Sequence, residues 1–127
     1  MADRHVLVIG LDPDFIDFSA PELAGKGVTA EKIRGGLKGD EDKLNGLGFK
    51  AETLLVGDGA TAERVVRERL GATRYDVVAI GAGIRTLPPY FLLFEKLINA
   101  VHEAAPQAKI AFNTSPADTA EAVKRWV

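Results

Sequence analysis

HVLVIGL, residues His5–Leu11, is the stretch that decides the fold of this chain, and DVVAIGA, Asp76–Ala82, has the same pattern. Both runs are short, almost wholly apolar and rich in valine and isoleucine. Strands that are buried on both faces, as in the middle of a parallel sheet, have this composition. The sequence therefore predicts two central strands.

Two further runs have the length of strands but a more polar composition. Phe49–Val56 (FKAETLLV) contains Lys50, Glu52 and Thr53, and Lys109–Phe112 (KIAF) is only four residues long. Charged side chains and short length are typical of edge strands. We therefore expect these two strands at the edges of the sheet.

Four segments carry apolar residues at the spacing of a helix face, and they alternate with the strands. They are 29–47, 61–70, about 88–105 and 115–126. Such alternation argues for parallel strands joined by right-handed helical crossovers. The predicted fold is a three-layer flavodoxin-like α/β domain, with a short parallel sheet of about four strands in the order 2-1-3-4. At 127 residues, the whole chain (1–127) is expected to form this single domain.

Composition excludes several classes of site and partner. The chain has no cysteine, which removes disulfides, thiolate nucleophiles and zinc–sulfur sites, and with two histidines we expect no metal site. The net charge is −2 without a basic stripe, so no nucleic-acid partner is expected. No apolar run approaches the ~20 residues that cross a membrane, and no export signal precedes the first strand. We expect a cytoplasmic protein with no membrane partner.

The topology places a ligand site at one edge of the sheet. In open parallel sheets, ligands bind beyond the carboxyl ends of the strands, where the strand order reverses. For the order 2-1-3-4 this point lies between the first and third strands. Glycines, carboxylates, an arginine and hydroxyls follow the four strands there, in the segments 10–14, 57–59, 81–86 and 113–115.

The turn after the third strand suggests an anion as the ligand. Gly81 and Gly83 would leave backbone N–H groups free beside a helix N-terminus, and Arg85 could grip a phosphate or carboxylate. Asn113 and Thr114 follow the neighbouring strand. We expect these five residues to bind a small anionic metabolite. The alternative is that the glycines only permit a tight turn and that Arg85 is solvated.

An acidic pair follows the first strand and resembles a catalytic motif. VLVIGLDPDFI (6–16) is similar to the first motif of haloacid-dehalogenase-like phosphatases, and IAFNTS (110–115) is similar to their second. The resemblance implies Asp12 as nucleophile and Asp14 as general acid, with Mg²⁺ between substrate and carboxylates. The family's later lysine and acidic pair have no counterpart here. The alternative is that Asp12 and Asp14 are loop residues on either side of Pro13, as turn chemistry prefers.

Three other resemblances bear on the fold. The layout resembles receiver domains of response regulators, with Gly81 where that family has its phosphoacceptor aspartate. DVVAIGAGIRT (76–86) resembles the dinucleotide fingerprint of flavin and NAD enzymes, with Thr86 in place of its third glycine. GAGIR (81–85), FEKLINAVH (94–102) and FNTSPADTAEAVKRW (112–126) are similar to small uncharacterised flavodoxin-like proteins of bacteria and fungi. The fingerprint implies a dinucleotide ligand, whereas the other two resemblances imply no particular cofactor or activity.

A non-catalytic interaction module, acting as a homodimer, is the alternative function. Leu92 and Leu93 are expected to point away from the buried face of the third helix, and Trp126 stands near the end of the chain. Exposed apolar groups of this kind can form a twofold contact. The long irregular segment Asp12–Val28 would explain Leu92 and Leu93 equally well by covering them.

The acidic run Asp40-Glu41-Asp42 is expected to be structural. With Lys43 beside it, the run has the composition of a solvated helix face. No site is predicted there.

Overall fold

A computed structural model describes residues 4–16, 18–19, 21, 23–57, 59–115 and 118–127. Four strands form one parallel sheet in the order β2-β1-β3-β4. Their bounds are β1 His5–Leu11, β2 Lys50–Val56, β3 Val77–Ile80 and β4 Lys109–Phe112. The predicted class, strand direction and strand order are confirmed, with the two apolar strands in the centre.

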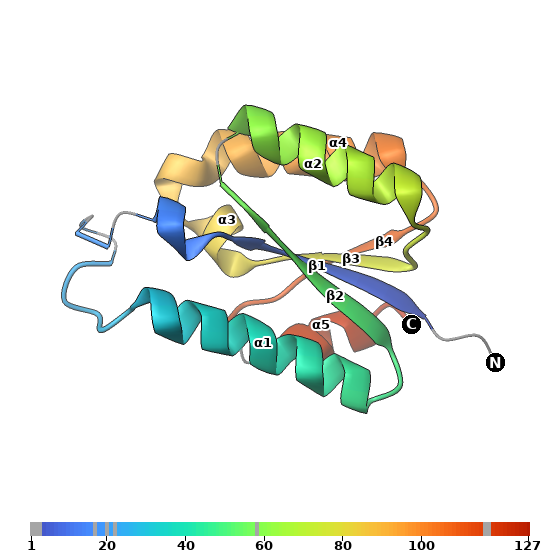
Figure 1. The fold of residues 1–127 in the computed structure, drawn as a ribbon, viewed down its shortest axis with the longest axis horizontal. Helices are drawn as coiled ribbons and strands as arrows, with labels where there is room; N and C mark the ends of the chain where they lie inside the picture. Colours follow the sequence, from blue (N-terminus) through green and yellow to red (C-terminus); the bar gives the residue numbers. More distant parts are fainter. Residues whose placement is uncertain (1–3, 17, 20, 22, 58, 116–117) are drawn as a thin grey trace.

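Helices cover both faces of the sheet (Figure 1). On one face lie α1 (Ala30–Gly46) and α5 (Thr119–Lys124), and on the other lie α2 (Gly59–Ala72) and α4 (Phe91–Ala104). Residues 116 and 117, at the predicted start of the last helix, lie outside the described residues. No helix within the described ranges is long and apolar enough to cross a membrane.

The side chains of β1 show why the sheet has two cores. Successive residues of a strand point to opposite faces. Leu7 and Ile9 are therefore buried with α2 and α4, and Val6 and Val8 are buried with α1 and α5. All four are at most 1% exposed, as expected for a central strand.

The segment after β3 differs from the single helix predicted from Pro88. It forms α3 (Ala82–Thr86), then the 3-10 turn η2 (Pro88–Tyr90), and only then α4. A 3-10 turn has about 3.0 residues per turn rather than 3.6, which rotates the following helix face relative to a continuous helix.

One predicted side-chain direction in α4 is wrong, because Leu93 lies four residues before Leu97 and eight before Val101 and therefore on the buried face of the helix. Leu93 was expected to point outward but is 6% exposed and belongs to the core. Phe91, at the start of the helix, is 60% exposed. Leu92 and Trp126 are exposed, as predicted.

Candidate functional site

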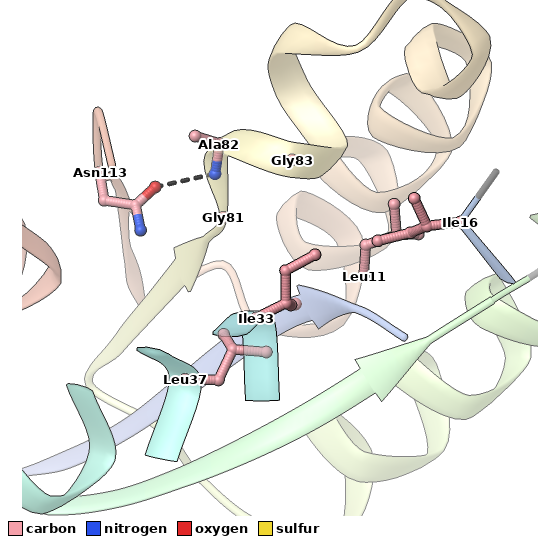
Figure 2. A pocket seen from close by; sticks show the side chains of 9 residues that line it. Leu11, Ile16, Ile33, Leu37, Gly81, Ala82, Gly83 and Asn113 are labelled. Carbon is pink, nitrogen blue, oxygen red and sulfur yellow. Dashed lines mark hydrogen bonds between the residues drawn. The ribbon is translucent and has the colours of Figure 1, made fainter. Parts of the chain in front are cut away.

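A cavity of about 100 Å³ lies at the carboxyl ends of β1 and β3 (Figure 2). The chain leaves β1 toward α1 on one face of the sheet and leaves β3 toward α3 and α4. This divergence opens the space that the strand order predicted. The ends of three strands contribute Gly10, Leu11, Gly81 and Asn113 to its lining.

Apolar side chains form most of the remaining wall. Ile33 and Leu37 come from α1, and Ile16 follows the 3-10 turn η1 (Pro13–Phe15). Figure 2 shows the Ile33 side chain extending from α1 toward the turn that carries Gly83. A Cβ added at Gly10 would lie 3.0 Å from a methyl of Leu37, so glycine at this position lets α1 approach the sheet closely.

Among the described lining residues Asn113 alone has a side-chain amide, and it is 5% exposed. Its Oδ1 accepts a hydrogen bond of 2.8 Å from Ala82 N, at the start of α3 (Figure 2). Its Nδ2 donates a hydrogen bond of 2.8 Å to Thr119 Oγ1 of α5. The Asn113 amide, at the end of β4, therefore links the start of α3, which follows β3, to α5.

Behind Asn113 the same network reaches Asp40, which was wrongly predicted on a solvated helix face. Asp40 is 5% exposed, because α5 packs against α1 at this point. Its Oδ2 accepts a hydrogen bond of 2.7 Å from Thr119 Oγ1. Burial raises the pKa of the Asp40 carboxyl above its ordinary value, and the hydrogen bond from Thr119 opposes that rise.

Arg85 lies at the end of the sheet and does not line the cavity. Its guanidinium donates hydrogen bonds to the backbone carbonyls of Ile80, at 3.5 Å, and of Asn113. It also lies over the Phe112 ring, 5.4 Å from the ring centroid. The Arg85 side chain ties the end of β3 to the end of β4. Its positive charge is therefore held close to Asn113, which lines the cavity.

Thr114 is exposed and turns away from the lining toward Asp118. Its hydroxyl donates to Asp118 Oδ2, while its backbone N–H and that of Ser115 donate to Asp118 Oδ1. The Thr114 hydroxyl and then these backbone N–H groups hold the pKa of Asp118 below its ordinary value, since they stabilise the carboxylate. Asp118 thereby holds Thr114 and Ser115 next to the start of α5.

The two candidate catalytic acids lie around η1, beside Arg34. Asp12 caps η1 by accepting a hydrogen bond of 2.9 Å from Asp14 N. Arg34 Nη2 lies 2.7 Å from Asp14 Oδ1 and 3.8 Å from Asp12 Oδ1. This arrangement joins the turn after β1 to α1. Among the described residues, no three His, Asp or Glu side chains gather as a metal site would require.

The structure thus brings together Gly81, Gly83 and Asn113 of the predicted ligand-binding set. Sequence reasoning missed Thr119 and Asp40. One signal pointed to Asp40: it lies three residues after Leu37 and four before Leu44, on the apolar stripe of α1 rather than on its polar face.

No model of a known protein family matches this chain, and the search of curated proteins likewise finds no match.

Proposed function

We propose that this chain binds a small anionic ligand, with the anionic group at the turn after β3 and the apolar part against α1. The observation that supports this most strongly is the cavity between the ends of β1 and β3, which lies where α/β sheets bind ligands.

The polar groups of the lining favour a negative charge. Among the described residues, Gly83 N–H has no hydrogen-bond acceptor, and Asn113 Nδ2 uses one of its two hydrogens on Thr119. Both groups are donors. None of the described residues that line the cavity carries a charge, and the guanidinium of Arg85 is bonded to the Asn113 carbonyl. A compact anion would therefore find donors and a nearby positive charge.

The size of the cavity limits what it can enclose. Pockets for drug-sized ligands occupy roughly 300–1,000 Å³. At about 100 Å³, this cavity suits a phosphate, a short carboxylate or one end of a longer molecule. Ile33 and Leu37 would contact the apolar carbons of such a ligand.

A thermal-shift screen tests the proposal. The panel contains phosphate, sugar phosphates, nucleotides, flavins and dicarboxylates, each with and without Mg²⁺. A ligand at a hundred times its dissociation constant stabilises the folded state by about 2.7 kcal/mol, which corresponds to several degrees in Tm. We expect at least one anion to produce such a shift.

Two matched variants decide where that ligand binds. Ile33→Phe fills the cavity, whereas Leu47→Phe adds a ring at the exposed end of the same helix. The shift should disappear in Ile33→Phe and persist in Leu47→Phe. A flat response of the wild type at millimolar concentrations would refute the proposal. A response that needs Mg²⁺ and is lost in Asp12→Asn would instead favour the phosphatase alternative.

A further inference from the structure

Three hydrogen bonds in series connect the rim cavity to a buried carboxyl group. They run from Ala82 N to Asn113 Oδ1, from Asn113 Nδ2 to Thr119 Oγ1, and from Thr119 Oγ1 to Asp40 Oδ2. The side chains of this series are almost fully buried: Asn113 and Asp40 are 5% exposed, and Thr119 is fully buried.

The chemistry of the two ends gives the series one direction. A backbone N–H can only donate, and an ionised carboxylate can only accept. The Asn113 carbonyl oxygen must therefore face Ala82, and its NH₂ group must face Thr119. The Thr119 oxygen is then an acceptor from Asn113, so its proton needs an acceptor elsewhere, and Asp40 provides it.

We propose that Asp40 is a positioning residue of the rim site: it takes the Thr119 proton, so the Thr119 oxygen stays an acceptor for Asn113 Nδ2 and holds the amide in the orientation that the Ala82 N–H sets. The effect on ligand affinity rests on the proposed function, whereas the ordering of the series does not. With Asp40 ionised, Asn113 presents its second Nδ2 hydrogen in a fixed direction, which suits an anionic ligand. A protonated Asp40 can donate as well as accept, so it no longer enforces this order.

The surroundings of Asp40 are mixed in charge. Lys43 faces it from α1, and Asp118 and Glu121 face it from the α5 side, with Lys43 Nζ 3.4 Å from Glu121 Oε1. The acidic groups and burial favour the protonated form, whereas Lys43 and the Thr119 hydroxyl favour the carboxylate.

The test is an NMR pH titration of the labelled wild-type chain without ligand. It follows the Asp40 carboxyl carbon, the Asn113 NH₂ group and the Ala82 amide. We expect all three to titrate with one midpoint. Asp118 has its pKa shifted in the opposite direction, so its own titration is separable. If Asp40 titrates while the Asn113 and Ala82 signals stay constant, the proposal is overturned.

Three variants assign the signal. Asp40→Asn should abolish the titration at Asn113 and Ala82. Asp42→Asn makes the same change on an exposed carboxylate two residues away and should preserve it. In Thr119→Val, Asp40 should still titrate while Asn113 no longer responds. If Asn113 keeps the wild-type titration in both Asp40→Asn and Thr119→Val, some other group orders the amide and the proposal fails.

A phosphate titration separates this proposal from the proposed function. If inorganic phosphate binds, Thr119→Val should weaken it about tenfold, the effect of one lost hydrogen bond, and Thr119→Ser should change it less than about twofold. Equal affinity in the wild type and both variants would contradict a positioning role. If no panel compound binds the wild type, the proposed function fails, and the pH titration without ligand still decides the ordering.

Discussion

The hydroxyl of Thr119 donates a 2.7 Å hydrogen bond to the carboxyl of Asp40, which lies 79 positions earlier in the chain. The contact joins α5 to α1 within a buried layer, and through Asn113 it reaches the cavity at the carboxyl edge of the sheet. It therefore couples the packing of one helical layer to the candidate site.

Thr119→Val should lower the free energy of unfolding by about 1–3 kcal/mol at pH 7. Valine keeps the shape of threonine but leaves Asn113 Nδ2 without its acceptor and Asp40 without its donor, and unsatisfied buried groups cost this much. Thr119→Ser keeps the hydroxyl and should lose only about 0.8 kcal/mol for one methyl group. Urea unfolding of the two variants measures the difference. Equal losses would show that the hydroxyl contributes nothing.

Asp40→Asn should change how stability depends on pH. Burial raises the pKa of Asp40 in the folded chain above its value in the unfolded chain. Between these two pKa values the folded state holds a proton that the unfolded state has lost, so the free energy of unfolding falls as pH rises through this interval. Asp40→Asn removes that fall.

The check is urea unfolding of the wild type and Asp40→Asn across the acidic to neutral range. The stability of Asp40→Asn relative to wild type should be higher at pH 7 than below the unfolded pKa of Asp40. Asp42→Asn, at an exposed site, is the control. A relative stability that decreases with rising pH would contradict the account.

Arg85→Ala should destabilise the chain by about 1–3 kcal/mol without any ligand. The guanidinium bonds to the carbonyls of Ile80 and Asn113, and a hydrogen bond from a charged group contributes about this much. Arg85→Lys keeps the charge but loses the planar fork, so it should restore only part of the loss. Thermal unfolding of both variants is the measurement. Unchanged stability in Arg85→Ala would contradict this structural role.

Gly57→Ala should displace η1 from β2. An added Cβ at Gly57 would lie 2.6 Å from the Phe15 ring, closer than real contacts allow. The Phe15 ring is 55% exposed and can move aside, so we expect a loss of only about 1 kcal/mol, together with weakening of the hydrogen bond from the Tyr90 hydroxyl to the Phe15 carbonyl. Gly71→Ala, where an added Cβ meets nothing within 4 Å, is the control. Amide shifts around Phe15 that are identical in the two variants would contradict this packing.

The fold was predictable because burial on both faces leaves a clear trace in sequence. β1 and β3 carry hardly any polar residue, and this alone placed them in the centre of the sheet. The strand order also predicted the position of the cavity, because ligands bind where the order of parallel strands reverses. Gly81, Gly83 and Asn113 follow the strands that border it.

The roles of single polar side chains were less predictable, because they depend on partners distant in sequence. Arg85 bonds to backbone carbonyls. Every residue has such a carbonyl, so the sequence does not indicate which ones Arg85 contacts. Asp40 stands in an acidic run that looks solvated, and only its place on the apolar stripe of α1 distinguishes it from Asp42. Leu93 was misplaced although it lies four residues before Leu97, at the spacing that puts both side chains on the buried face of α4.

The most direct test of the central claim is a map of amide chemical shifts in the ¹⁵N-labelled chain, titrated with inorganic phosphate and with the anions that raise its Tm. We predict saturable changes that are largest at Leu11, Gly81–Gly83 and the Asn113 side chain, the residues around the rim cavity. Changes confined to another surface, such as the exposed Phe91 and Leu92 of α4, or no saturable change at all, would contradict it.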